Sequence, residues 1–389
     1  MRRAWKRSKD EVFAWVWLAV VLVVTGPPVA AVETLVVEVE GRRHELVGMP
    51  LVEAQDGGLL LLATDGMIWP LQPQEIKSRQ RDDRPFTLLD RQQLAERLLA
   101  EMPGYSVFHT QHYLIVYNTS PAYAQWCGSL FERLFKTFFN FWKIRGWELQ
   151  PPQMPLVAVV FDSRERFLGY ATDEIGQAAH GIIGYYSMKT NRIAMYDLTG
   201  ADELKRLRPQ LRSTTHLNLL LAQPEAERLV ATIVHEATHQ LAYNSGLQVR
   251  FAGNPMWVSE GLATYFETPD LRSDRGWRTV NAVNRLHWTR FREKLAGRRS
   301  DALIGLLTDD ARFHDPATVA DAYSEAWAFT YFLLNRRSEK FVEYLKSLSQ
   351  KQPLEEDAPA ERVRRFSEMV GDLEELEAEF IKYMSRLRP

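Results

Sequence analysis

The sequence of 389 residues contains a single cysteine and no excess of charge of either sign. Cys127 alone cannot form an intramolecular disulfide or a multi-cysteine metal site, and we expect it to be a small buried hydrophobe. Lys and Arg number 48 against 50 Asp and Glu, so the basic excess typical of nucleic-acid partners is lacking. A hydrophobic content of 46% with 25% charged residues excludes disordered, collagen-like and coiled-coil proteins, and the length indicates more than one domain.

A long apolar run is found at the N-terminus. Five basic residues within the first nine positions precede an apolar stretch at 12–24, and residues 29–31 (VAA) offer a cleavage site. This pattern predicts an export signal at 1–31 and a periplasmic or extracellular protein. The apolar core is shorter than the roughly 20 residues of a membrane span. A membrane anchor through an uncleaved segment is the alternative, because the uncharged stretch extends to Val32.

The rest of the chain divides by pattern into a small β domain, a linker and one large domain. Short apolar runs separated by Asp-Gly turns predict an antiparallel sheet over 32–76. Residues 77–87 are charged and contain a proline, so we expect a linker there. Residues 88–389 form the large domain. Without residues 1–31 the chain carries 43 basic and 48 acidic residues, a mildly acidic balance.

The large domain is predicted to be α+β, with a β-containing front half and a helical back half. Alternating residues around Asn191 indicate a hairpin, and after Pro224 helical periodicity dominates. The expected strands are 112–117, 156–161, 182–186 and 192–196, and the expected helices include 90–102, 122–144, 163–170, 318–348 and 360–387.

Residues 235–239 (HEATH) carry the clearest chemical signal. Two histidines four positions apart lie on one face of a helix, so both imidazoles can reach one metal ion. Glu236 can point at a metal-bound water without being a ligand. Pro224 near the start of this helix and a polar stop after Leu241 support the helical prediction. His235 and His239 are therefore candidate zinc ligands.

A catalytic zinc site normally has three protein ligands and an open position, so a third ligand is needed. Asn254 and Pro255 have the residue types of an N-cap and a first helical residue, and the apolar helix that follows contains Glu260. A carboxylate in such an apolar segment is costly to bury without a strong partner, and a metal ion is one. Glu260 is the candidate third ligand.

These residues resemble the gluzincins, thermolysin-like zinc peptidases of the HExxH type. His235, Glu236, His239 and Glu260 match that pattern, and 259–263 (SEGLA) is similar to the NExxA signature with Ser259 in place of asparagine. The segments HEATHQLAYNSGL and NPMWVSEGLATYFE are also similar to peptidase-MA-like bacterial exported proteins of unknown function. The resemblance implies a thermolysin-like zincin catalytic unit that binds Zn²⁺.

The activity implied by the resemblance is hydrolysis of peptide bonds in peptide or protein substrates. Glu236 would assist the attack of zinc-bound water and pass the proton to the leaving amine. Tyr323, in the helical back half, is the candidate donor to the developing oxyanion. An extended substrate would lie along an edge strand, which the resemblance places at the hairpin of residues 185–196.

The sequence departs from the family pattern at two places. Some relatives have an aspartate four positions after the third ligand, where this chain has Thr264; Glu267 or another carboxylate is expected to support a zinc histidine instead. A GxMEN-like segment is missing, which argues for an endopeptidase over an aminopeptidase. The alternative is a catalytically silent zinc-binding pseudo-peptidase that acts as an envelope or peptide-binding module, although structural zinc would not require Glu236.

Overall fold

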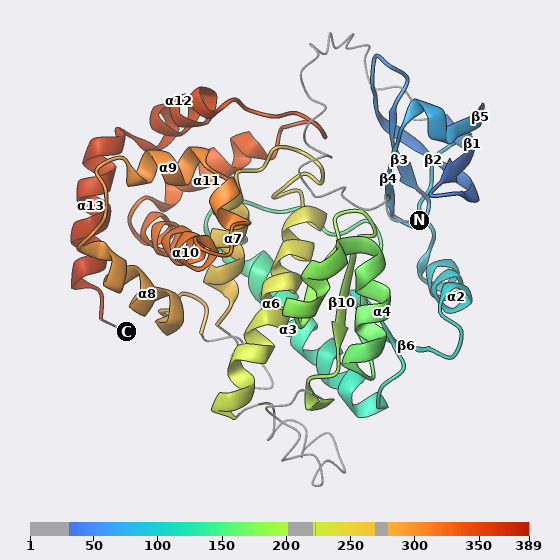
Figure 1. Ribbon diagram of the computed structural model, residues 1–389, viewed down its shortest axis with the longest axis horizontal. Coiled ribbons are helices and arrows are strands. Elements are labelled where there is room, and N and C mark those ends of the chain that lie inside the picture. The colour runs from blue at the N-terminus through green and yellow to red at the C-terminus, as the bar shows by residue number, and fades with distance from the viewer. Residues whose placement is uncertain (1–30, 201–220, 222, 269–278, 389) are drawn as a thin grey trace. The chain divides into compact units, whose positions relative to one another are not determined.

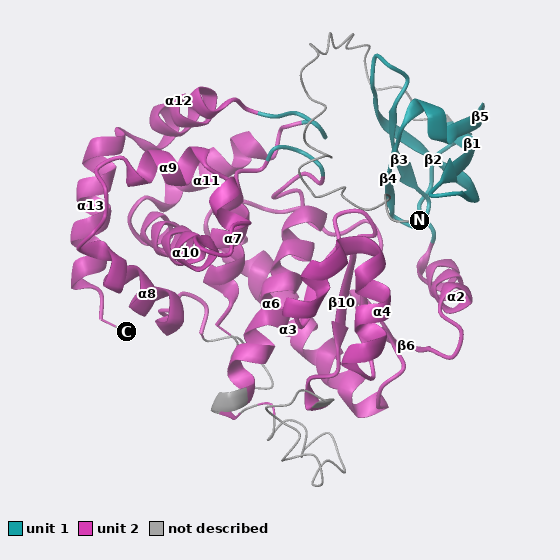
Figure 2. Ribbon diagram, in the orientation of Figure 1, with its two compact units in different colours: residues 1–89, 251–253, 352–356 teal, residues 90–250, 254–351, 357–389 magenta. Residues whose placement is uncertain are grey.

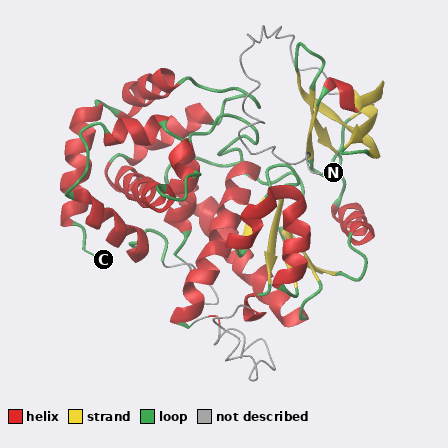
Figure 3. Ribbon diagram, in the orientation of Figure 1, coloured by secondary structure: helices red, strands yellow, loops and turns green. Residues whose placement is uncertain are grey.

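A computed structural model describes residues 31–200, 221, 223–268 and 279–388 (Figure 1). The described chain is mixed α+β, with two five-stranded sheets and eleven α-helices (Figure 3). It divides into two compact units (Figure 2): unit 1 is 1–89, 251–253 and 352–356, and unit 2 is the remainder. Apart from Ala31, the predicted export signal lies outside the described residues. Within the described ranges no helix is both long and apolar enough to cross a membrane.

Unit 1 is built around an antiparallel sheet with the strand order β4-β3-β2-β1-β5. Alternate residues of β1, such as Leu35 and Val37, are fully buried and pack with Leu46, Leu59 and Leu61 in one apolar cluster. This period of two is what a strand with one buried face requires. The strands are β1 (Ala31–Val39), β2 (Arg42–Glu53), β3 (Leu59–Ala63), β4 (Ile68–Leu71) and β5 (Ile76–Pro85).

The predicted linker at 77–87 is wrong, because most of it is strand β5. This strand pairs with β1 at the edge of the sheet, and its residues from 77 to 81 are exposed. Nε of Arg79 lies 2.6 Å from Oε2 of Glu33, and its Nη1 lies 2.8 Å from Oε1 of Glu53. An exposed edge strand needs backbone pairing but no apolar alternation, and charged residues there discourage further pairing. The charge run therefore marks an edge strand.

Unit 2 contains a mixed sheet with the order β6-β7-β8-β10-β9. The three inner strands are parallel, and the edge strands β6 and β9 are antiparallel to their neighbours. The predicted hairpin is confirmed as the pairing of β9 with β10. The strands are β6 (Ser106–His109), β7 (Tyr113–Tyr117), β8 (Leu156–Phe161), β9 (Gly184–Tyr186) and β10 (Arg192–Tyr196).

Helices supply the rest of unit 2 and dominate after Pro224, as predicted. The predicted helical stretches 318–348 and 360–387 are each two helices, with breaks at Arg337 and at Gly371, which has φ 142°. The helices are α2 (Arg91–Glu101), α3 (Pro121–Ile144), α4 (Arg164–Ile175), α6 (Pro224–Asn244), α7 (Met256–Phe266), α8 (Arg285–Leu295), α9 (Ala302–Thr308), α10 (Val319–Arg336), α11 (Ser338–Leu348), α12 (Pro359–Val370) and α13 (Leu373–Arg386).

Helices α7 and α10 pack closely against each other. Every residue of α7 from Trp257 to Phe266 is buried, as expected of a helix that is apolar on all sides. A Cβ at Gly261 would lie 2.8 Å from the carbonyl oxygen of Ala326 and would overlap the Thr330 hydroxyl. Glycine at this position therefore permits the close approach of the helix that carries Glu260. The expected burial of Cys127, on α3, is also confirmed.

Candidate metal centre

Helix α6 presents the two histidines. It begins at Pro224, a residue suited to the first helical turn because its missing N–H would be unpaired there. Val230, Ile233, Val234, Ala237 and Leu241 are buried, so packing fixes the rotation of the helix about its axis. His235 and His239 are one turn apart on α6, and their Nε2 atoms are 3.1 Å apart.

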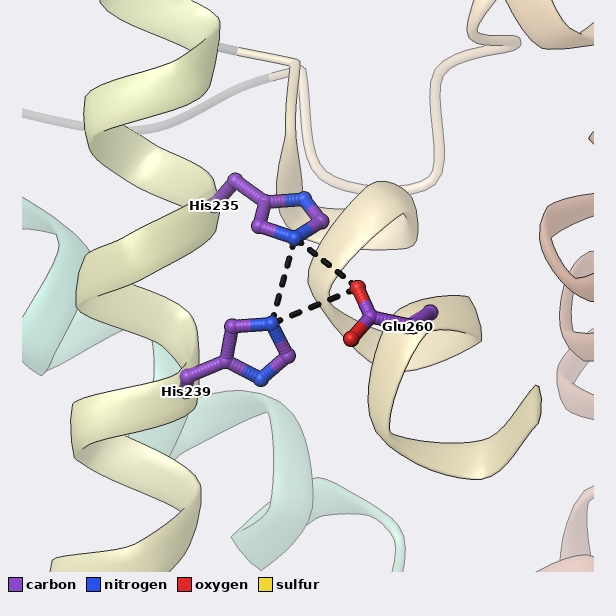
Figure 4. Close-up of side chains that lie close together, drawn as sticks. All are labelled: His235, His239 and Glu260. Atoms are coloured by element: carbon purple, nitrogen blue, oxygen red, sulfur yellow. Dashed lines mark hydrogen bonds and ion pairs between the residues drawn. The ribbon is translucent and has the colours of Figure 1, made fainter. Parts of the chain in front are cut away.

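Glu260 on α7 completes a cluster of three possible ligands (Figure 4). Its Oε2 lies 3.1 Å from Nε2 of His235 and 3.5 Å from Nε2 of His239. In a tetrahedral zinc site with bonds of 2.0–2.1 Å, ligand atoms are about 3.3 Å apart. The three distances in the cluster bracket that value. The donor set of two imidazole nitrogens and one carboxylate oxygen therefore fits Zn²⁺, and the predicted ligands do converge.

The pKa values of His235 and Glu260 are shifted because both groups are buried next to other charges. Burial lowers the pKa of His235, but hydrogen bonds to Glu260 and Glu267 outweigh it and raise this pKa well above 6.5. Burial raises the pKa of the Glu260 carboxyl, but the charge of His239 and hydrogen bonds from both histidines hold it well below 4.5. In the metal-free protein a proton therefore stays on His235, opposite an ionised Glu260.

Zinc binding is expected to tighten as the pH rises, because the metal must replace the proton on His235. While one proton is displaced, the affinity should rise about tenfold per pH unit. Competition with a chelator at pH values from about 5.5 to 8 measures this slope. A zinc affinity independent of pH over that range would contradict the assignment of His235 as a ligand.

The same pKa shifts make the contribution of the His235–Glu260 pair to the stability of the metal-free protein depend on pH. The raised pKa of His235 contributes stability below the unfolded value of 6.5, which is lost as the pH rises through the folded value. The lowered pKa of Glu260 contributes stability above 4.5, which is lost as the pH falls through its folded value. Between 4.5 and 6.5 both contributions are present.

Glu236 lies beside the histidines but outside the ligand cluster. Its Oε2 accepts a hydrogen bond of 2.8 Å from the backbone N–H of Tyr186, the last residue of the edge strand β9. Burial raises the pKa of the Glu236 carboxyl, against the opposing effects of His235, His239 and the Tyr186 N–H. A carboxyl with a raised pKa is suited to accept and release a proton near neutral pH.

Glu267 contacts His235 on the side away from the cluster, where the sequence predicts Glu267 or another carboxylate. Its Oε2 lies 3.5 Å from Nδ1 of His235, the nitrogen that does not face the cluster. Burial raises the pKa of Glu267, but hydrogen bonds to His235 and His287 lower it to about 2, so the carboxylate is ionised. Such a partner holds a metal-binding imidazole in one tautomer and orientation. The Thr264 hydroxyl instead donates to the backbone carbonyl of Glu260 at 2.7 Å.

Tyr323 reaches the cluster from α10. Its ring stacks on that of His235, with ring centroids 6.0 Å apart and an interplanar angle of 21°. Burial, and then the carboxylates of Glu260 and Glu236, raise the pKa of Tyr323 well above 10, so its hydroxyl keeps its proton. The structure therefore brings this predicted site residue next to the ligands, as a half-buried proton donor.

The start of α7 differs from the sequence prediction. The helix begins at Met256 with Pro255 as its N-cap, one residue later than expected, and Asn254 instead donates to the carbonyl of Val249. Oδ1 of Asp310 accepts from the Met256 N–H at 3.0 Å, which supplies the missing cap from a distant segment. Nη1 of Arg362 holds the other oxygen of Asp310 at 2.6 Å. Helix α7 is thus anchored by residues that local sequence cannot identify.

Replacing Asp310 by alanine is expected to lower the free energy of unfolding by about 2 kcal/mol or more. The change removes a helix cap, worth about 0.5–2 kcal/mol, and leaves the buried Arg362 without this carboxylate. Urea unfolding of the zinc-free protein measures the loss. Asp310→Asn retains an acceptor for the cap and should lose less, so equal losses for the two variants would contradict this role.

Comparison with known proteins finds a family model that matches the segment containing the cluster. A family model described as a protein of unknown function (DUF1570) matches residues 229–355. That stretch contains the three possible ligands as well as Glu236 and Tyr323. Among curated proteins, none matches the chain.

Proposed function

We propose that this protein is an exported zinc-dependent metallopeptidase, an endopeptidase that hydrolyses peptide bonds in peptide or protein substrates. The observation that carries the proposal is the position of Glu236, a carboxyl with a raised pKa next to two histidines and a carboxylate that fit zinc. A purely structural zinc site would normally have four protein ligands and would need no general base. Glu236, which lies between the two histidines in the sequence, is of the type that a hydrolase requires as a general base.

Each residue near the cluster has a distinct role in this proposal. His235, His239 and Glu260 would hold Zn²⁺, which supplies Lewis acidity and lowers the pKa of a bound water towards about 7. Glu236 accepts the water proton and delivers it to the leaving amine. Tyr323 donates a hydrogen bond to the oxygen of the scissile carbonyl as negative charge develops on it. Glu267 keeps His235 oriented.

The substrate is expected to bind as an extended chain along β9. This strand is at the edge of its sheet, and the N–H of its last residue, Tyr186, already faces Glu236. Main-chain pairing with an edge strand gives affinity for peptides with little dependence on sequence. The same pairing would place a scissile carbonyl near the carboxylate of Glu236. The lack of a GxMEN-like segment favours internal cleavage, and the signal pattern at 1–31 favours a periplasmic or extracellular substrate.

The proposal is tested by metal analysis combined with a digest of a broad peptide library. We expect about one zinc per chain, cleavage by the zinc-loaded protein, loss of cleavage after chelation and its return when zinc is restored. Stoichiometric zinc with no cleavage of any peptide would favour the silent zinc-binding module instead. A protein that binds no zinc would contradict both functions.

A further inference from the structure

Behind His235, a line of polar side chains continues away from the ligand cluster. Oε2 of Glu267 lies 3.5 Å from Nδ1 of His235 and 3.7 Å from Nε2 of His287, on helix α8. On its other side, Nδ1 of His287 lies 3.3 Å from the hydroxyl oxygen of Ser324, on α10. Both histidines are 8% exposed, so water cannot readily replace these partners.

The hydrogen-bond donors and acceptors next to His287 determine which of its contacts can be hydrogen bonds. The Ser324 hydroxyl donates its one proton to the carbonyl of Ala320 at 2.8 Å, so towards His287 it can only accept. The ionised carboxylate of Glu267 can also only accept. His287 therefore faces an acceptor with each ring nitrogen, and a proton on its Nε2 is directed at Glu267.

We propose that His287 is a positioning residue of the metal centre, which donates from Nε2 to Glu267 and so holds that carboxylate against Nδ1 of His235. With Nδ1–H of His235 directed at Glu267, the lone pair of its Nε2 faces the metal position. Ser324 fixes the ring of His287 from the other side. The inference rests on the proposed metal site and does not depend on hydrolysis.

A purely structural role for His287 makes a different prediction. Its ring stacks on Trp327, with centroids 6.4 Å apart, and any smaller side chain would lose that packing. Packing alone would make all polar replacements of similar size equivalent for zinc binding. The proposed role instead depends on a donor at one particular position, because only Nε2 faces Glu267.

Two variants of the full chain separate these roles. In His287→Gln the amide nitrogen can reach the position of Nε2, whereas in His287→Asn it reaches only that of Nδ1. We expect His287→Asn to weaken zinc affinity about tenfold or more in competition with a chelator, and His287→Gln to stay within about threefold of the unchanged protein. The Co²⁺-loaded His287→Asn variant should also show an altered visible spectrum. Equal zinc affinity for both variants would overturn the proposal, whatever their thermal stability.

A second measurement needs no variant. Nitrogen-15 NMR of the zinc-loaded protein should show a proton on Nε2 of His287, the nitrogen that faces Glu267. A His287 whose Nε2 carries no proton would overturn the inference. Failure of the unchanged protein to bind zinc would instead refute the metal site itself, so the two failures are distinguishable.

Discussion

Replacement of Glu236 by glutamine is expected to lower kcat/KM for peptide hydrolysis by about 10²–10⁴-fold while zinc is still bound. Glutamine has nearly the same shape, and its amide oxygen can still accept from the Tyr186 N–H, which lies 2.8 Å from the carboxylate. It cannot take a proton from water. The loss corresponds to about 2.7–5.5 kcal/mol of transition-state stabilisation.

Glu227→Gln is the matched control for this change. Glu227 is exposed on the same helix, α6, so the control makes the same chemical change away from the cluster and should leave both zinc content and kcat/KM unchanged. The measurement is initial-rate hydrolysis of a peptide taken from the library digest, with zinc content determined on the same samples. Retained activity in zinc-loaded Glu236→Gln would refute the assignment of the general base.

Glu260→Gln should weaken zinc binding by about 100-fold or more. Loss of an outer hydrogen-bond partner of a ligand typically costs 10–100-fold, and loss of a charged ligand should exceed this. The substitution also removes the buried carboxylate that pairs with His235 in the metal-free protein at 3.1 Å. The pKa of His235 should then fall, and the stability that this pair contributes below pH 6.5 should disappear.

Zinc affinity and the pH dependence of unfolding together test this second prediction. Glu227→Gln again serves as the control, because it changes the net charge of the protein by the same amount. An affinity within about threefold of the unchanged protein would show that Glu260 is not a ligand. In that case a water or another carboxylate would have to complete the site.

The candidate metal ligands could be predicted because their geometry is local. Helical periodicity places His235 and His239 on one face of α6. Two histidines at this spacing with a glutamate between them have few interpretations other than a metal site. Glu260 required one further step, the recognition of a carboxylate in an apolar helix. Glu267 could be suggested only because Thr264 stands where some proteins of the resembled family have an aspartate that supports a zinc histidine. The two-unit α+β architecture also follows from periodicity, since runs of short strands precede the helical half.

Features that depend on contacts between distant segments could not be predicted. The Tyr186 N–H meets Glu236 across 50 residues, and Asp310 caps α7 across 54 residues. A backbone donor and an isolated aspartate leave no pattern in the sequence. The edge strand β5 was mistaken for a linker because its pairing with β1 uses the backbone and leaves its charged side chains exposed. The contact of His287 with Glu267 likewise arises only because the fold brings α8 beside Glu267.

The most direct test of the account is a structure of the zinc-loaded protein determined with anomalous diffraction at the zinc absorption edge. We expect one ion bound by Nε2 of His235, Nε2 of His239 and a carboxylate oxygen of Glu260, with bonds of about 2.0–2.2 Å, and with Glu236 outside the coordination sphere. Zinc bound at another position, or Glu236 in place of Glu260 among its ligands, would contradict the central claim.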